Sequence, residues 1–452
     1  MTLFSNIRLK VAATIPFYNE YSMSLFAAIF RPHDKPFKLP LWLLALCCAL
    51  PILGVWTTAN GMGWPTYLQG ADIRPYYTGG ALVLNGEGAR LYDLDAQWRA
   101  QRNAFPGLQN RDDLLPFLAP PFVAAPMAIL AMLPVKSAFL VWLACNWILL
   151  SLLTQRFAQV VALSGRRAQI VAVVACITCA PVFVTLLQGQ WALVLALSSF
   201  FAWQGLRNNR PFRGGLWLAL WLFKPQLLLL PLAVLLWKKQ LRVLAGFALG
   251  SAFLGTVSLA MIGFEGLKSY GQLLKTASGW SNQLGVRPEA MHTWRGFLHN
   301  FTSETNAWWW LGVAPMLMIL AWSWRGAWPI GAAIPRTLAE GRSNPTRFDA
   351  CWAMTIFAAL FCSPYLYYHD LTLLLVPVLL VASVAQNSDT FVSPRFKKLL
   401  LCLPIFGFAL FWIEFFFAGH PLGMVAPNVF FMTLCFVVLA VFIARQRRIA
   451  SL

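Results

Sequence analysis

Charged residues, and acidic ones above all, are scarce in this chain. Only 16 of its 452 residues are Asp or Glu and only 11% are charged, whereas 59% are hydrophobic. This balance excludes an ordinary soluble domain. Several apolar runs reach the ~20 residues that a helix needs to cross a bilayer. The sequence therefore predicts an all-α, polytopic helical membrane protein with about twelve transmembrane helices.

Nucleotide-binding motifs and paired cysteine motifs are also missing. The chain has no G-x-G-x-x-G or Walker A pattern, and its predicted inner loops are too short for a nucleotide-binding domain. This excludes an ATP-driven pump and argues against the use of a cytosolic sugar nucleotide. The one C-x-x-C, Cys176 and Cys179, falls inside an apolar helix without a second pair, so we expect core packing rather than metal or redox chemistry.

The 35 Lys and Arg residues flank hydrophobic spans, which indicates membrane orientation rather than nucleic-acid binding. The first 38 residues lack a signal-cleavage pattern and predict a cytoplasmic segment with a helix on the inner leaflet. The basic clusters then place loop 60–117, loop 264–304 and the Ser363–Asp370 turn outside. The expected units are residues 1–38, a catalytic module 39–263 that includes loop 60–117, the outer loop 264–304, and C-terminal helices 305–452.

Two proline-containing segments do not fit simple spans. Pro120–Pro134 is short and apolar, and predicts a helix that enters only half the membrane. Gly214–Trp237 predicts a short hairpin bent at Lys224-Pro225, because proline breaks a helix and irregular backbone is tolerated where it lines a cavity. With these two bends every basic cluster falls inside, and Gln190 and Lys224 face the same outer space as loop 60–117. Gln190 is therefore also a candidate for a substrate contact.

Loop 60–117 holds six of the 16 acids and is expected to carry amphipathic helices. Asp72 lies just beyond the first span, where a carboxylate can act as a general base on an alcohol. The alternative is a helix N-cap, since Asp72 precedes Ile73-Arg74-Pro75; the two roles are compatible. No metal site is expected.

Four further groups of residues are candidates for substrate contacts. Lys224 lies between apolar residues, where a lysine suits a phosphate or snorkels to an interface. His369 and Asp370 are candidates for binding a phosphate or a sugar hydroxyl. Tyr76 and Tyr77 are candidates for stacking on sugars, and aromatic packing is the alternative for both.

The fourth group lies in loop 264–304. Arg287, His292 and Arg295 form a basic patch on the expected outer side, which suits an anionic ligand or lipid headgroups. The spacing of His292, Arg295 and His299 predicts one helical face.

Several short motifs, taken in order, resemble the GT-C membrane glycosyltransferases and in particular glycosyltransferase family 87, whose members use polyprenol-phosphate-mannose. The resemblance extends from about Leu39 to Ala444. The chain differs from the family at Trp191-Ala192. Its anchors are Ala71-Asp-Ile-Arg-Pro-Tyr-Tyr77, Ala81-Leu-Val-Leu-Asn-Gly86, Ala119-Pro-Pro-Phe122, Gln188-Gly-Gln-Trp191, Lys224-Pro225, Ser363-Pro-Tyr365 and His369-Asp370.

The resemblance implies an inverting transfer of a hexose, expected to be mannose, from a polyprenyl-phosphate donor to a lipid or glycan hydroxyl outside the cytoplasmic membrane. Asp72 matches the family's catalytic aspartate. The leaving phosphate needs cations, and Lys224 is the first choice, followed by Arg74, Arg287 and His369. A monophosphate donor needs no nucleotide and does not oblige the enzyme to use a divalent metal, although Asp72 with a second acid would supply ligands.

Rival functions remain open from the sequence. A transporter or lipid flippase also fits Lys224 and broken helices, but it predicts internal repeats and several intramembrane acids, and only Glu414 lies deep in a span. A ligase acting on lipid-linked glycans is expected to have a larger outer loop that is richer in arginine.

Overall fold

The computed structural model describes residues 41–160, 166–280, 283–302, 305–325, 327, 345–387, 392–417 and 427–450. Across these residues the chain is built from α-helices and short 3-10 helices without strands, and one isolated bridge joins Gln283 and Val286. The predicted all-α fold is therefore confirmed. The N-terminal helix expected within residues 1–38 lies outside the described residues. The largest inner loop expected from the sequence, about Arg325–Arg347, also lies mostly outside them.

Within the described residues, 5 helical segments are long and apolar enough to cross a membrane. The chain is thus a multi-pass membrane protein, while the total of about twelve spans stays a prediction. These segments are α7 (Val135–Val160), α13 (Leu241–Ala277), η6 with α18 (Tyr368–Leu374 and Leu375–Gln386), α19 (Pro394–Phe416) and α21 (Pro427–Ala450).

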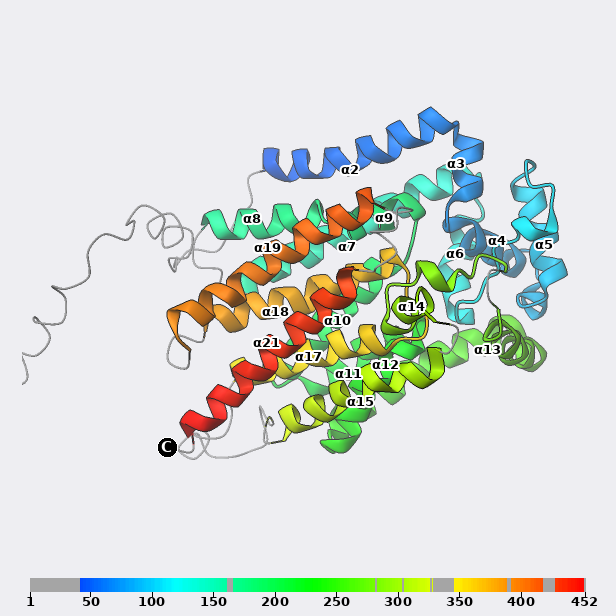
Figure 1. The fold of residues 1–452 in the computed structure, drawn as a ribbon. Helices are drawn as coiled ribbons and strands as arrows, with labels where there is room; N and C mark the ends of the chain where they lie inside the picture. The colour runs from blue at the N-terminus through cyan, green and yellow to red at the C-terminus, as the bar shows by residue number, and fades with distance from the viewer. Residues whose placement is uncertain are drawn as a thin grey trace, which may run out of the picture.

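The loop after helix α2 (Leu41–Met62) folds into short helices that gather at one end of the bundle, together with the end of α13 (Figure 1). We call this the Asp72 end. The helices of this region are α3 (Trp64–Gly70), α4 (Ile73–Leu84), η1 (Gly88–Arg90), α5 (Leu94–Ala104), η2 (Arg111–Asp113), η3 (Pro121–Val123) and α6 (Ala124–Leu130).

Most acids of this loop either cap the start of a helix or pair with a nearby cation. Asp93 accepts two backbone N–H groups at the start of α5. Asp95 pairs with Arg111 at 2.5 Å, and Asp113 completes a capping box at η2. These acids stabilise the loop locally, whereas the contacts of Asp72 lead out of the loop to Gln190 and His369.

The bend predicted at Lys224-Pro225 is confirmed, and the half-membrane depth predicted for Pro120–Pro134 stays a prediction. Pro120–Pro134 contains only η3 and α6, which together form a short apolar helix. In Gly214–Trp237, α11 (Pro211–Ala219) and η4 (Leu220–Phe223) end at Lys224, whose φ of −133° and ψ of 76° are not helical. Helix α12 (Pro225–Trp237) then begins with a proline, which lacks the N–H that would continue the first helix.

The expected outer loop 264–304 begins with a helical segment, and its position outside the membrane stays a prediction. Helix α13 continues to Ala277, with a break at Gly263, where φ is 64° and ψ is −177°. Glycine adopts this backbone conformation without the steric cost of a side chain. The apolar stretch that ends at Gly263 therefore leads into a second helical segment.

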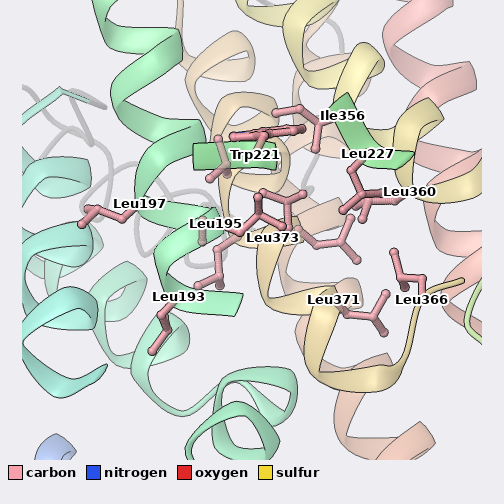
Figure 2. Close-up of a cluster of buried hydrophobic side chains, with 14 of the residues drawn as sticks. Leu193, Leu195, Leu197, Trp221, Leu227, Ile356, Leu360, Leu366, Leu371 and Leu373 are labelled. Carbon is pink, nitrogen blue, oxygen red and sulfur yellow. The ribbon is translucent and has the colours of Figure 1, made fainter. Parts of the chain in front are cut away.

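Apolar side chains from five helices form a core cluster around α10 (Ala192–Arg207) and α17 (Pro345–Cys362). Between helices in lipid, close packing and polar contacts stabilise association, because lipid tails are as apolar as the core. Figure 2 shows this cluster, which includes Leu193, Leu195 and Leu197 of α10, Trp221 of η4, Leu227 of α12, Ile356 and Leu360 of α17, and Leu371 and Leu373 of η6.

A buried ion pair joins α10 and α17 at the other end of these helices. Arg207 Nε lies 3.3 Å from Asp349 Oδ1, and the Asp349 side chain is 1% exposed. The indole N–H of Trp203 donates to the same oxygen at 2.8 Å. Since α10 rises about 24 Å over its length, this pair, which we call the Arg207 pair, is far from the Asp72 end.

Candidate active site

Asp72 lies in the short connection between α3 and α4. It occupies the N-cap position of α4, but its φ of −68° and ψ of −9° are helical, and its side chain makes no capping hydrogen bond. The side chain is 34% exposed. The capping alternative is therefore not realised, and the carboxylate is available for other contacts.

A glycine turn at the end of α9 (Ala180–Gln188) brings two glutamines to Asp72. Gly189 has φ +65°, and a Cβ there would lie 2.9 Å from Cβ of Ile73, so only glycine fits this left-handed, close-packed position. Gln188 Oε1 accepts the backbone N–H of Asp72 at 3.0 Å. Gln190 Nε2 donates to Asp72 Oδ2 at 2.8 Å.

Tyr76, one turn into α4, fixes the other end of the Gln190 amide. Its hydroxyl donates to Gln190 Oε1 at 3.0 Å. Burial raises the pKa of Tyr76 well above its ordinary value, and the charges of Asp72 and Asp370 raise it further. The phenol therefore stays protonated and acts as the donor. Tyr76 and Gln190, which the sequence suggested as substrate contacts, both belong to the surroundings of Asp72.

His369 and Asp370 in η6 connect Asp72 with Lys224. His369 Nδ1 is 3.7 Å from Asp72 Oδ2, and its Nε2 is 3.3 Å from Asp370 Oδ1. Lys224 Nζ donates to the same Asp370 oxygen, and Asp370 Oδ2 accepts the backbone N–H of Tyr367 at 3.1 Å. Four ionisable residues thus form one continuous cluster at the Asp72 end.

The ion pair accounts for Lys224 better than snorkelling does. Its side chain is only 16% exposed, and that of Asp370 is 1% exposed. A buried carboxylate is stable only when it is paired and hydrogen-bonded, and Asp370 has partners for both oxygens. Asp370 therefore holds Lys224 and His369 in place. This role differs from the direct contact with a sugar hydroxyl that was expected from the sequence.

Two other predicted residues near Asp72 contact the loop itself. Arg74 is 4% exposed, and its Nη2 donates to the Asp113 carbonyl at 2.6 Å. Burial lowers the pKa of Arg74 to about 10, although the Asp113 and Asp72 charges favour its protonated form. The Tyr77 hydroxyl donates to the Leu133 carbonyl at 2.9 Å. Both side chains stabilise the fold of the loop, and neither contacts Lys224 in the described residues.

In the described residues, the side chains predicted from loop 264–304 form no hydrogen bond or ion pair with Asp72. His292 Nδ1 is 2.9 Å from Glu414 Oε1 and 3.1 Å from Asn428 Oδ1. Helix α14 (Trp294–His299) begins only after His292, so the expectation that His292, Arg295 and His299 share one helical face is wrong. Arg295 is half-buried on α14, and Arg287 has an exposed side chain whose backbone N–H donates to the Tyr367 hydroxyl at 3.1 Å.

Sequence reasoning missed the threonines that support the cluster, whereas Gln188 was already part of the Gln188-Gly-Gln-Trp191 motif. The Thr185 hydroxyl contacts the His369 carbonyl at 3.1 Å and the Thr372 hydroxyl at 2.9 Å, which joins α9 to η6. Tyr367 and Gln188 contribute the backbone N–H and the amide oxygen described above. The one available signal was the position of Thr185, one helical turn before Gln188 on the same face of α9.

The cluster offers a partly exposed carboxylate on one side and a largely buried lysine on the other. A carboxylate in this position can accept a proton from a bound hydroxyl, and the lysine and imidazole N–H groups can stabilise a developing negative charge. In the described residues, no three His, Cys, Asp or Glu side chains converge as they would around a metal ion.

The fold and this cluster define a polytopic membrane protein with a polar site at one end of an apolar helix bundle. The profile of glycosyltransferase family 87 matches residues 117–364, more than half of the chain. The chain belongs to this family and is a glycosyltransferase. The matched range contains Gln190 and Lys224, whereas Asp72 and His369 lie outside it. Searches of curated proteins and of solved structures gave no match.

Proposed function

We propose that this glycosyltransferase moves a hexose, mannose in the first instance, from a polyprenyl-phosphate donor to a hydroxyl of a lipid or glycan acceptor. The observation that carries the proposal is the placement of Asp72 beside His369 and, through Asp370, Lys224. A carboxylate base and a cation therefore lie at the two ends of one cluster. The reaction needs both, because the base accepts the proton of the hydroxyl and the cation stabilises the leaving phosphate.

In the proposed reaction, Asp72 takes the proton of the acceptor hydroxyl. The acceptor oxygen forms a bond to the anomeric carbon of the sugar from the face opposite the phosphate, so the configuration inverts. The bond between the anomeric carbon and the phosphate oxygen breaks, and its electron pair stays on the polyprenyl phosphate. Positioned proton transfer of this kind contributes roughly 10²–10⁴-fold to a rate.

Lys224 and His369 are the proposed contacts for the leaving phosphate. The pairing with Asp370 orients Lys224, and a lysine ammonium has three N–H donors, of which Asp370 uses one. A cation that is already in position stabilises the new negative charge without reorganisation during the reaction. The exposed Arg287 lies beside Tyr367, next to this cluster, and adds positive charge to the same region.

A lipid-linked donor is also supported by what surrounds the cluster. It lies among apolar helices that suit a polyprenyl chain, and the donor carries its energy in the glycosyl phosphate bond. The basic clusters of the sequence orient the Asp72 end toward the periplasm or exterior. Polyprenyl-phosphate sugars serve enzymes on that side because nucleotide sugars are cytosolic.

The direct test is a transfer assay with purified protein and a membrane lipid extract as the source of acceptors. The donors are polyprenyl-phosphate mannose, polyprenyl-phosphate glucose and mannose on a nucleoside diphosphate. We expect mass spectrometry to find lipids that are heavier by one hexose only with a polyprenyl-phosphate donor. Equal transfer from the nucleotide sugar, or none from any lipid donor, would contradict the proposal.

A further inference from the structure

We propose that Gln190 is a positioning residue that selects which oxygen of Asp72 acts as the base, and that Tyr76 fixes the orientation of Gln190. This inference rests on the proposed function and assigns these residues a role different from contact with the sugar. It identifies Asp72 Oδ1 as the atom that receives the acceptor's proton.

The two oxygens of Asp72 have different surroundings. Oδ2 accepts the Gln190 amide N–H at 2.8 Å and lies 3.7 Å from His369 Nδ1. Among the described residues, Oδ1 has no hydrogen-bond partner at all. A hydrogen bond to a carboxylate oxygen stabilises its negative charge and reduces its tendency to take a proton. The free oxygen is therefore the basic one, and it is the one open to a substrate hydroxyl.

The direction of the Gln190 amide follows from its other partner. The oxygen and nitrogen of an amide are distinguished by their hydrogen bonds. The Tyr76 phenol is protonated and donates to Oε1 at 3.0 Å, which directs the NH₂ group toward Asp72. If the amide turned over, its oxygen would face the carboxylate, and two acceptors would oppose each other.

The backbone around Gln190 is held firmly enough for this role. Gly189 adopts the left-handed conformation that no other residue fits against Ile73. The Trp142 indole N–H donates to the Gly189 carbonyl at 2.8 Å, so the turn is anchored to α7. The Gln190 side chain is also largely enclosed, since the residue is 6% exposed. Enclosure leaves little surface for a sugar, which favours positioning over substrate contact.

In the proposed reaction only Asp72 accepts a proton from the substrate. The acceptor O–H bond breaks, its proton moves to Asp72 Oδ1, and the acceptor oxygen bonds to the anomeric carbon as the phosphate leaves with its electron pair. Gln190 neither gains nor loses a proton. Its removal should therefore change the turnover rate and its pH dependence more than the binding of the donor.

Several charged or titratable groups face Asp72 and must be kept constant in a pH experiment. His369 and Asp370 face it from η6, Arg74 and Tyr76 from α4, and Lys224 through its pairing with Asp370. Gln190→Glu leaves these groups unchanged and puts a second carboxylate beside Oδ2. Like charges favour protonation, so the rise of kcat with pH should move to higher pH in this variant.

The experiment measures kcat, the KM for polyprenyl-phosphate mannose and the pH profile for the wild type, Gln190→Ala, Gln190→Glu and Tyr76→Phe. We expect Gln190→Ala to lower kcat about 10- to 100-fold, as loss of a hydrogen bond to a charged group does, with KM within about twofold. Gln190→Glu should shift the pH profile upward by about one unit, and Tyr76→Phe should lower kcat less than Gln190→Ala.

Tyr77→Phe is the matched control, because it removes the same hydroxyl one residue along α4 from a hydrogen bond to Leu133; its kcat should equal that of the wild type. A raised KM with unchanged kcat in Gln190→Ala, or an unshifted profile in Gln190→Glu, would overturn the positioning role. If Gln190→Ala does not fold, Tyr76→Phe and Gln190→Glu still decide the question. Absence of transfer by the wild type would instead refute the proposed function.

Discussion

Lys224–Asp370 and Arg207–Asp349 are two buried ion pairs. The first joins the start of α12 to η6, and the second joins the end of α10 to the start of α17. In both, the carboxylate side chain is 1% exposed and the cation is only partly exposed, 16% for Lys224 and 23% for Arg207. They differ in their neighbours. Asp370 adjoins His369 and, through it, the 34% exposed Asp72, whereas Asp349 is bonded to Trp203 and Arg207 of one helix.

The difference teaches that a buried charge does not by itself mark an active site. The Arg207 pair ties α10 to α17, and one oxygen of Asp349 has no hydrogen-bond partner in the described residues. The Asp370 carboxylate is fully partnered and supports an accessible carboxylate nearby. A buried pair becomes relevant to chemistry when it orients a group that a substrate can reach.

The largest expected effect on activity is that of Asp72→Asn, which changes the accessible carboxylate next to the Lys224–Asp370 pair. Asparagine keeps the size of the side chain and loses the base, so we expect transfer to fall by about 10²–10⁴-fold with little change in melting temperature. The measurement is the initial rate of glycolipid formation. Asp112→Asn, an exposed acid of the same loop, should keep full activity, and full activity in Asp72→Asn would remove Asp72 from the mechanism.

Lys224→Ala should affect both activity and stability, because it removes the proposed phosphate contact and leaves Asp370 buried without its cation. We expect donor kcat/KM to fall by about 10²-fold and stability by about 3 kcal/mol or more. Lys224→Arg keeps the charge and should recover most of the melting temperature. Donor kinetics equal to the wild type in Lys224→Ala would leave the lysine with a structural role only.

Asp349→Asn should distinguish the role of the Arg207 pair from that of the Lys224–Asp370 pair. It leaves Arg207 without a charged partner, but that side chain reaches solvent, so a loss of about 1–3 kcal/mol is expected. Turnover measured below the melting temperature should be unchanged. Thermal unfolding in detergent and the transfer assay together check this, and a large fall in kcat with normal stability would show that both ends of α10 serve catalysis.

The smallest expected effect concerns His292, which is paired with Glu414 and belongs to neither of the two buried ion pairs compared above. Burial lowers the pKa of His292, but the Glu414 charge and hydrogen bonds from Glu414 and Asn428 outweigh this and raise it above its ordinary value, with a further contribution from Asp370. A raised pKa stabilises the fold fully below about pH 6.5, and this stabilisation is lost as pH rises through the value in the folded protein.

The melting temperature of the wild type should therefore exceed that of His292→Gln most at about pH 6. The difference should narrow toward alkaline pH. A thermal-shift series across pH measures it directly. A difference that widens with rising pH would mean that His292 is stabilised in its neutral form.

The sequence allowed some of this site to be predicted because certain residues conflict with their surroundings. Lys224 stands out in an apolar run, and Asp72 in a chain with few acids. Lys224-Pro225 also predicted a helix break for a local reason, the missing N–H of proline. Apolar runs of sufficient length predicted the helical membrane fold.

Pairings between distant segments could not be predicted in the same way. Gln190 lies 118 residues from Asp72, and Lys224 lies 146 residues from Asp370. Such contacts depend on how helices pack, and periodicity in one segment says nothing about its partner. For the same reason His292 was expected on a basic face, and its burial against Glu414, 122 residues away, was not foreseen.

The most direct test of the account is an experimental structure with a non-reactive polyprenyl-phosphate sugar bound. We predict that the phosphate contacts Lys224 and His369, and that the anomeric carbon faces Asp72 with space for an acceptor hydroxyl at Oδ1. A phosphate bound at the Arg207 pair, or one separated from Lys224 with the sugar turned away from Asp72, would contradict the account.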